Sequence, residues 1–520
     1  MSLLPFFAVA IVGTVVATLL RDIRRLGTVA GLGAVVVALA AACYVQPDTP
    51  IVIGGGALAG SDHLRLVLTL CLAGGLLVLV VARLATWQPS APGALLGGAA
   101  GIGLALGLAG TPPGLLGAAA ATIAASALAL GSPAAPSRIR ALARELRGAV
   151  TSVVIGLIAA GIVPGAATSP APGAAVAEPA AAALVLLGMA LVVAHRFGAI
   201  PLHARVSRLA DAAPSGALPI LAAWLPAAWG LIILGWAPAA LGWSSAGLDL
   251  ERGLIVALAL ATLVLGTVAA LVQDEVEHVV AYTIVADAGV ALLALAALDP
   301  AARDAARSWV LVFAATRTAM IGWTIAFRAA FGTGRLRDTA GWLRRAPALG
   351  VALAGILVAA VGWPGLLTWD ARLAILQSAT AGPALLLAYA ATLGTGAAII
   401  RLLVVGSGRP SAVVAGALGE LPRLPARPGA EAAVPVTGGA PRAGAIGTVG
   451  AIAGRLRALT AEAGRDARPS LDLNRVPLRA FAVMMLAGLA FLAAAGAFGI
   501  DAAARAPGPV LPSPAPIVGG

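Results

Sequence analysis

Long apolar runs separated by short polar gaps fill most of the sequence. Many of these runs reach roughly 18 residues, the length that an α-helix needs to cross the hydrocarbon core of a bilayer. They lack the strict alternation of polar and apolar residues that marks the strands of a membrane barrel. Because only helices and closed barrels satisfy their backbone hydrogen bonds in lipid, the pattern predicts an all-α polytopic membrane protein.

The runs predict about 14 transmembrane spans. The expected limits are residues 3–20, 26–45, 64–87, 94–109, 115–130, 149–163, 180–195, 217–236, 254–272, 276–298, 308–331, 347–378 (broken), 382–405 and 477–500. The gaps between them suggest the following division: an N-terminal three-helix segment (1–90), two multi-helix stretches (91–240 and 250–405), a cytoplasmic linker (406–476), a last helix (477–500) and a disordered tail (501–520). Within the linker, residues 451–463 could form an amphipathic helix on the inner membrane surface.

The charge pattern supports this topology. Hydrophobic residues make up 60% of the chain, charged residues 11%, and the formal net charge is +12. The arginines cluster in alternate gaps, which is how a membrane protein marks its cytoplasmic face, so we expect both termini outside and no nucleic-acid partner. Only the acidic loop at residues 274–278 breaks the alternation, because it falls on the arginine side. The chain contains no lysine, and arginine does not release its proton in proteins.

Two stretches combine helix breakers with apolar surroundings, at residues 195–219 and 361–376. Proline removes a backbone donor and kinks a helix, and glycine lets the backbone unwind. In membranes such breaks are tolerated where they are buried in protein or line a wet cavity. Paired breaks in the two halves of a transporter point to its conduction path, although a plain loop or packing kink remains the alternative.

Charged residues inside spans are costly and tend to be functional. The candidates are Asp287, Arg317 in mid-span, and Asp370 with Arg372, which could form a pair just beyond the second break. Arg372 could instead extend to an interface. Two histidines, His278 at a helix mouth and His203 in the first break, are each either a proton carrier or a satisfied interface residue.

Three segments resemble the antiporter-like, proton-conducting membrane subunits of respiratory complex I and their relatives in membrane-bound hydrogenases and Mrp-type cation/proton antiporters. RFGAIPLH at 196–203 is similar to the family pattern K-x-G-A-x-P-F-H. AALVQDEVEHVVAYTIVADAG at 269–289 is similar to A-A-L-x-Q-x-x-x-K-R-x-L-A-Y-S-S-I-x-H-x-G. VGWPGLLTWDAR at 361–372 is similar to A-G-I-P-P-x-x-G-F-x-x-K. Subunit N, and secondly subunit M, is the nearest kind.

The resemblance implies two inverted five-helix repeats, each with a broken helix, around a hydrated chain of lysine, histidine and glutamate. This sequence departs from that pattern at most of its charged positions. The family's lysine and arginine of K-R-x-L-A-Y-S stand here as Glu277 and His278, its histidine as Asp287, and its last lysine as Arg372. Arg196 occupies the lysine position of the first break, the next expected lysine falls on Pro226 or Ala227, and the fifth helix carries no charge to match the expected glutamate.

These residues leave three hypotheses. The chain is a proton-translocating membrane-arm subunit of a complex I-like NADH-quinone oxidoreductase with a degenerate proton path, or a structural paralogue that does not pump. The third is an Mrp-type or hydrogenase-associated antiporter subunit. No nucleotide loop, metal-ligand spacing or nucleophilic triad occurs in the sequence, so we expect no catalytic, metal or cofactor site in this chain alone. Quinone, NADH, FMN and iron–sulfur clusters would belong to partner subunits, and the complex would lie in a bacterial inner membrane.

Overall fold

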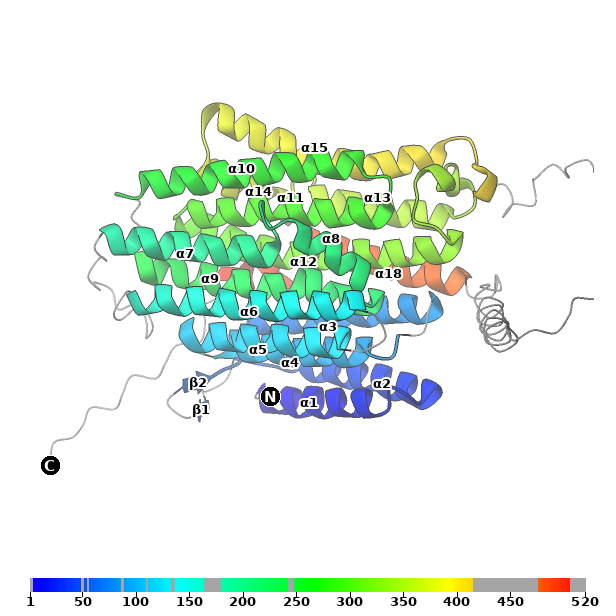
Figure 1. The fold of residues 1–520 in the computed structure, drawn as a ribbon, viewed down its shortest axis with the longest axis horizontal. Helices are drawn as coiled ribbons and strands as arrows, with labels where there is room; N and C mark the ends of the chain where they lie inside the picture. The colour runs from blue at the N-terminus through cyan, green and yellow to red at the C-terminus, as the bar shows by residue number, and fades with distance from the viewer. Residues whose placement is uncertain are drawn as a thin grey trace, which may run out of the picture.

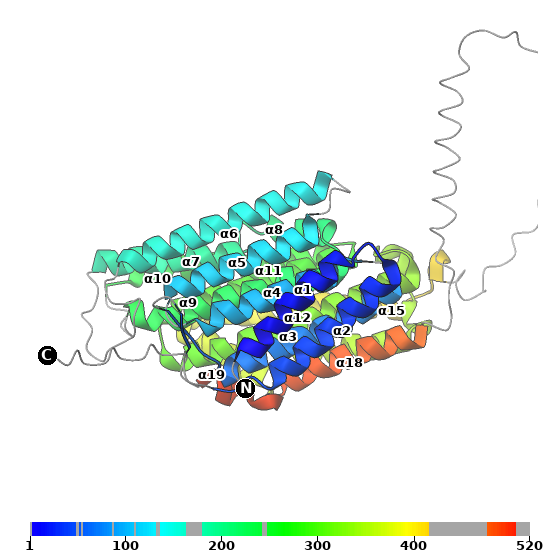
Figure 2. The ribbon, with the colours of Figure 1, turned by 90° about the horizontal axis from the view of Figure 1, so that it is seen from below.

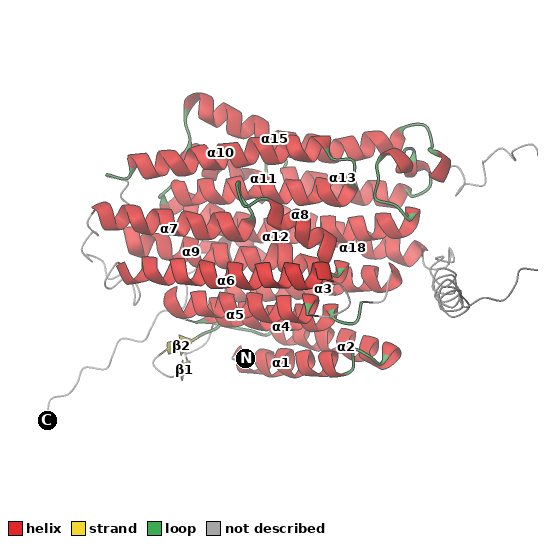
Figure 3. Cartoon of the chain, viewed as in Figure 1, coloured by secondary structure: helices red, strands yellow, loops and turns green. Residues whose placement is uncertain are grey.

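The computed structural model describes residues 3–47, 51–53, 56–85, 88–108, 111–131, 136–162, 179–241, 247–414 and 476–505. Within these residues the chain forms a bundle of helices that lie roughly parallel to one another (Figure 1). A short antiparallel hairpin of β1 (Ile51–Ile53) and β2 (Gly56–Leu58) lies beside one end of the bundle. The remaining elements are all helical or irregular, as Figure 3 shows by colour, so the predicted all-α class is confirmed.

The N-terminal half contains eleven helical elements among the described residues. In chain order they are α1 (Leu3–Leu19), α2 (Arg24–Cys43), α3 (Asp62–Ala85), α4 (Ala91–Gly107), α5 (Thr111–Leu130), α6 (Pro136–Ile162), α7 (Pro179–Phe197), α8 (Ala204–Ala212), the 3-10 turn η1 (Ser215–Ala217), the π-helical turn η2 (Ile220–Trp224) and α9 (Leu225–Leu241). The first break is real: α7 ends at Phe197, and six residues, including Gly198 and Pro201, separate it from the start of α8 at Ala204.

The C-terminal half also contains long helices and one break. Its elements are α10 (Asp249–Val272), α11 (Val276–Ala296), α12 (Pro300–Phe331), η3 (Arg337–Thr339), η4 (Trp342–Arg344), α13 (Pro347–Val361), α14 (Leu367–Ala379), α15 (Gly382–Ser407), α18 (Val476–Ala494), η6 (Ala497–Gly499) and α19 (Ile500–Arg505). The second predicted break separates α13 from α14, with Gly362 at φ 81° and Gly365 at φ 92°. Only glycine adopts such positive φ angles readily.

Ten helices of the described chain are long and apolar enough to cross a membrane, and the bent pair of α18 with η6–α19 would make eleven. The shorter apolar helices α1, α4 and α13 fall below that length. Each of the expected spans coincides with a helix, but the count of fourteen and the two inverted repeats stay predictions. The multi-pass membrane character is established by the ten long apolar helices.

The core of the bundle is built around α11 and α12. In both helices nearly every residue beyond the first turns is buried. α12 lies in the middle of the bundle (Figure 2), and it packs against α3, α9, α11, α13, α14 and α18. Trp323 stacks on Phe327 with ring centroids 4.9 Å apart, and Trp342 packs edge-on against both rings. Both helices are enclosed by other helices over most of their length, so the charged side chains near their middle lie inside the protein.

Two expectations about boundaries are corrected. Residues 138–147, which we placed in an arginine-rich gap, belong to the first turns of α6, because the helix begins at Pro136. Residues 501–505, which we placed in a disordered tail, form α19 at an angle of 69° to α18. This short helix packs on α12, and the Arg307 guanidinium donates a hydrogen bond to the Ala504 carbonyl. The predicted linker after residue 414, its amphipathic helix at 451–463 and the tail beyond 505 lie outside the described residues.

Candidate functional site: two buried carboxylate–arginine clusters

The first candidate site joins three charged side chains from three helices of the C-terminal half. Asp287 of α11 accepts a hydrogen bond from Nε of Arg317 at 2.6 Å, and a second nitrogen of the same guanidinium also contacts its Oδ2. Nη2 of Arg372, on α14, lies 3.9 Å from Asp287 Oδ1. All three side chains are at most 8% exposed. Sequence reasoning named each of these residues, and the structure brings them together.

Other donors of the two arginines bind fixed groups, although Nε of Arg372 has no hydrogen-bond partner among the described residues. Arg317 donates to the Thr283 hydroxyl at 3.0 Å, one turn before Asp287 on α11. Arg372 donates to the carbonyls of Val361 at 2.7 Å and Ala360 at 2.9 Å. These carbonyls belong to the last turn of α13, where the helix break leaves backbone acceptors without intrahelical partners. A cation at a helix C-terminus also complements the helix dipole, so the break at Gly362 and the arginine that follows it form one unit.

Asp370 does not take part in this cluster. We expected it to pair with Arg372, but its side chain is exposed on α14, whereas Arg372 is buried and reaches Asp287. Residues two apart on a helix point in different directions, which is why the pairing fails. The interfacial alternative for Arg372 is also wrong, because its guanidinium is enclosed by α11, α13 and α14.

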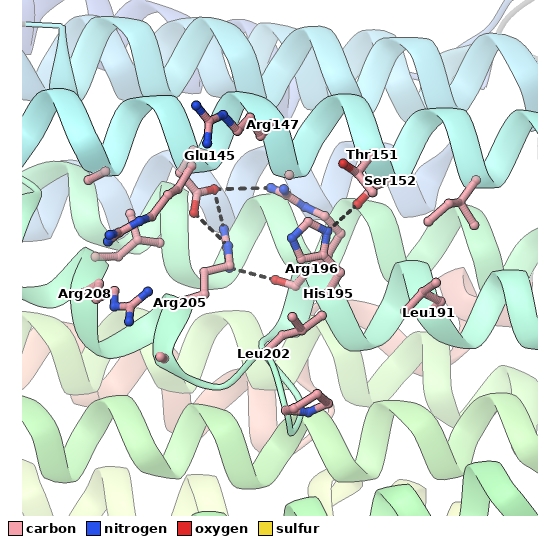
Figure 4. A pocket seen from close by; sticks show the side chains of 17 residues that line it. Glu145, Arg147, Thr151, Ser152, Leu191, His195, Arg196, Leu202, Arg205 and Arg208 are labelled. Atoms are coloured by element: carbon pink, nitrogen blue, oxygen red, sulfur yellow. Dashed lines mark hydrogen bonds and ion pairs between the residues drawn. The ribbon is translucent and has the colours of Figure 1, made fainter.

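A matching cluster lies at the first break, and sequence reasoning found only part of it. Oε2 of Glu145, on α6, accepts a hydrogen bond from Nη2 of Arg205, on α8, at 2.9 Å, and Nε of the same arginine lies 2.8 Å from Oε1 as an ion pair. Nη2 of Arg196, at the end of α7, lies 3.6 Å from the same carboxylate. The Glu145 and Arg196 side chains are 4% and 0% exposed. The arrangement is again one carboxylate between two arginines (Figure 4).

In both clusters an arginine donates hydrogen bonds to the backbone carbonyls at the end of the broken helix. Arg205 donates to the Arg196 carbonyl, in the last turn of α7, at 2.7 Å, just as Arg372 donates to the last carbonyls of α13. Around Arg196, the Trp229 ring lies 5.5 Å from the guanidinium carbon. The Thr122 hydroxyl of α5 accepts from Arg196 at 3.4 Å and from Trp229 Nε1 at 3.1 Å. α5 carries no charged residue, as expected, but the neighbouring helix α6 supplies the carboxylate.

Glu145 and Arg205 were missed because hydropathy places both in polar gaps between the predicted spans. The buried residues of α6 nevertheless follow one face at helical spacing, including Ala141, Glu145, Gly148, Ser152 and Gly156. A stripe of small residues marks a face that packs closely on other membrane helices. A glutamate in register with that stripe, amid arginines on the other faces, was the signal that could have identified it.

The acidic loop that interrupts the charge alternation lies at the surface. Glu277 pairs with Arg328 at 2.7 Å, and His278 contacts Asp211 at 3.1 Å through Nε2. The other acidic side chains of the loop pair with arginines of the adjoining loops and of α15: Asp274 with Arg337 and Arg401, and Glu275 with Arg335. Arginines of the same side of the bundle therefore neutralise the acidic charge of this loop. Glu277 and His278 lie at the start of α11, away from the buried Asp287 further along the same helix.

A cavity of about 520 Å³ adjoins the Glu145 cluster, between α6 and the break from α7 to α8. Figure 4 shows Glu145, Arg196, Arg205 and His195 around it, with His195 Nδ1 3.1 Å from the Ser152 hydroxyl. His203, the remaining candidate, is half-buried at the start of α8 and does not line this cavity. Within the described residues no group of three or more His, Cys, Asp or Glu side chains could hold a metal ion.

Fold and site together define a polytopic membrane protein with buried ionic clusters at two broken helices. Residues 173–397 match the family model described as NADH:quinone oxidoreductase/Mrp antiporter, TM. NADH-quinone oxidoreductase subunit N of Laribacter hongkongensis is 27% identical over 38% of this chain and 40% of its own length. The subunit N of Halorhodospira halophila is 28% identical over 47% of this chain and 50% of its own length. The matched segments thus span half or less of these relatives.

Solved structures show the same fold. A chain of the Mrp complex from Dietzia sp. DQ12-45-1b superposes with a TM-score of 0.65 at 19% identity, covering 77% of this chain and 47% of that one. A chain of respiratory complex I from Thermus thermophilus superposes with a TM-score of 0.60 at 21% identity, covering 81% and 98%. Residues 173–397 are thus similar in sequence to this family, the curated relatives quoted above are subunit N proteins, and the fold is similar to that of the Mrp and complex I chains.

Proposed function

We propose that this chain is a membrane-arm subunit of a complex I-like NADH-quinone oxidoreductase and takes part in proton translocation coupled to electron transfer. Its partners are other membrane-arm subunits, and NADH, FMN, iron–sulfur clusters and quinone bind elsewhere in the complex. It resides in a bacterial inner membrane with both termini outside. The similarity to subunit N proteins in sequence and to complex I in fold supports this assignment.

One observation carries the proposal: each half of the chain holds a buried carboxylate between two arginines at a helix break. Burying charged side chains inside a membrane protein costs free energy. Apolar side chains of similar volume in place of a buried ion pair often give a protein that is as stable or more stable. Two such clusters at corresponding breaks are therefore better explained by a role in charge movement than by packing.

The chemistry of the clusters limits that role. Arginine keeps its proton in proteins, so only Asp287 and Glu145 can take up or release a proton within the two clusters. Each carboxylate is held by hydrogen bonds from an arginine, Arg317 or Arg205. A proton can replace that arginine only if the ion pair opens. The second arginine of each cluster sets the local field and holds the end of the broken helix.

The test is proton pumping by the whole complex, purified and reconstituted in vesicles. Asp287→Asn keeps the shape of the side chain and removes the only proton-accepting group of its cluster. We expect fewer protons pumped per electron pair, with the assembled complex intact. The matched control is Asp370→Asn, the same chemical change at an exposed position of α14, which should leave the stoichiometry unchanged.

A second candidate function is a structural paralogue that does not pump. It is favoured by the absence of lysine from the sequence and by the sharing of each carboxylate between two arginines. Under this function Asp287→Asn lowers stability or assembly and leaves the stoichiometry of the complex unchanged. An Mrp-type or hydrogenase-associated subunit is the remaining alternative, and purification from the native membrane would identify it by its partner subunits.

A further inference from the structure

The cavity beside the first cluster has an unusual concentration of arginine. Its lining includes Arg144 and Arg147 from α6, Arg196 from α7, and Arg205 and Arg208 from α8. Glu145 is the single carboxylate among the residues that line it, so the wall is strongly positive. Charged walls of one sign around a recess concentrate the opposite charge.

Much of this positive charge is not used by the protein itself. The exposed guanidinium groups of Arg144, Arg147 and Arg208 make no ion pair or hydrogen bond with any residue that the structure describes. Arg196 is fully buried, yet its Nε and Nη1 have no hydrogen-bond partner in the described chain. A buried cationic donor without a partner is costly. An anion in the cavity would satisfy both sets of arginines.

Apolar side chains also line the cavity, beside the polar Thr151, Ser152 and His195. Ile155 of α6, Leu191 of α7 and Leu202 in the break line it, and Leu191 is 49% exposed. The arginines lie toward the start of α6, the end that the charge pattern assigns to the inner leaflet. A ligand that fits both parts has an anionic head and a hydrocarbon chain.

We propose that this cavity binds the phosphate headgroup of an anionic phospholipid of the inner leaflet, with an acyl chain lying along α6 and α7. The planar guanidinium fork matches the oxygens of a phosphate. Basic pockets between transmembrane helices on the cytoplasmic side are typical of such recognition. This site requires only the membrane fold, so it stands whether or not the subunit pumps protons.

The experiment uses the full-length protein, purified in detergent, and native mass spectrometry with phosphatidylglycerol or phosphatidylcholine as the probe. The site variant is Arg144→Gln with Arg147→Gln. The matched control is Arg138→Gln with Arg140→Gln, the same charge change one to two turns earlier on α6, outside the cavity lining. We expect phosphatidylglycerol affinity to fall on the order of tenfold in the site variant, from the loss of two arginines at a membrane surface, and less than about twofold in the control.

A third variant keeps every charge and fills the cavity. Thr151→Trp places a large ring at an exposed position of the lining, and it should also displace phosphatidylglycerol. Equal losses in the site and control doubles would overturn the proposal, because they would indicate diffuse surface charge. So would phosphatidylcholine binding as tightly as phosphatidylglycerol. If inorganic phosphate displaces phosphatidylglycerol at a concentration similar to that of the lipid, the site binds a soluble anion, and the proposal of a lipid ligand is wrong.

Discussion

At the scale of single residues, the central feature is a carboxylate that holds two arginines at once. Asp287 is bound closely by Arg317 and more loosely by Arg372, whose other donors hold the end of α13. The two arginines are therefore not equivalent. Arg317 neutralises the carboxylate, whereas Arg372 divides its charge between Asp287 and the helix-end carbonyls.

Arg317→Met should destabilise the protein strongly. The substitution keeps an unbranched side chain of similar length but leaves Asp287 buried with its nearest cation 3.9 Å away. Removing one partner of a buried ion pair typically costs about 3–5 kcal/mol. The measurement is the free energy of unfolding of the detergent-solubilised protein, followed by denaturant titration. Adding Asp287→Asn to Arg317→Met should recover part of the loss, because no charged carboxylate is then left buried.

The control for that experiment is Arg328→Met. Arg328 is 64% exposed and pairs with Glu277 at the surface, where ion pairs contribute about 0–1 kcal/mol. A loss in Arg328→Met as large as that in Arg317→Met would show that burial of the Asp287 pair has no special energetic role.

Sequence reasoning at this scale identified which residues were unusual but not which residues pair. Asp287, Arg317 and Arg372 were recognised because charge is rare in apolar spans, and the resemblance marked two of them. The partner of Arg372 was misassigned to Asp370, since proximity in sequence was taken for proximity in space. Asp287 lies on a different helix, 85 residues away along the chain. The packing of α11 against α14 brings it to Arg372, and this tertiary contact cannot be predicted from the spacing of residues along the sequence.

At the scale of helices, close packing of α10 on α11 holds Asp287 in place. A Cβ atom at Gly266 of α10 would lie 2.7 Å from the backbone nitrogen of Ala286, the residue before Asp287. One at Gly289 of α11 would lie 2.6 Å from the Ala259 carbonyl oxygen. Small residues let membrane helices approach at backbone distance, and this contact fixes the position of the cluster.

Two glycines of α10 should therefore respond to alanine with opposite signs. Gly266→Ala forces α10 and α11 apart and should cost about 1–3 kcal/mol, as overpacking does. Gly253→Ala meets no atom within 4 Å, so it should stabilise the helix by up to about 1 kcal/mol. Thermal unfolding of both variants in detergent measures the difference. A Gly266→Ala protein as stable as Gly253→Ala would refute the close contact.

Sequence patterns predicted most helices and both breaks, because apolar runs, glycine and proline act locally. They failed where a helix continued through polar residues. α6 begins at Pro136, before four arginines and Glu145, so its first turns resemble a loop in hydropathy. Its buried face was visible only as a spacing of small residues, a weaker signal than the strong local charge.

At the scale of the whole molecule, the charges sort to the two ends of the bundle. The acidic loop at 274–278 and the arginines of 335–337 meet at one end, joined through the pairs Asp274–Arg337 and Glu275–Arg335. Asp299 caps the opposite end of α12 by accepting from the Ala302 nitrogen at 3.1 Å. The arginine-rich end, with the cavity beside α6, is the one that the positive-inside rule assigns to the cytoplasm.

The two ends of α12 should accordingly be reachable from opposite sides of the membrane. This helix has 32 residues, about 48 Å at 1.5 Å per residue, more than the thickness of the hydrocarbon core. In a background with Cys43→Ala and Cys71→Ala, a membrane-impermeant maleimide should label Ala301→Cys in right-side-out vesicles and Arg337→Cys in inside-out vesicles. Both positions are exposed, and Arg337 is 83% so. The reversed pattern would place the arginine-rich end outside, and labelling of both positions from one side would mean that α12 does not cross the membrane.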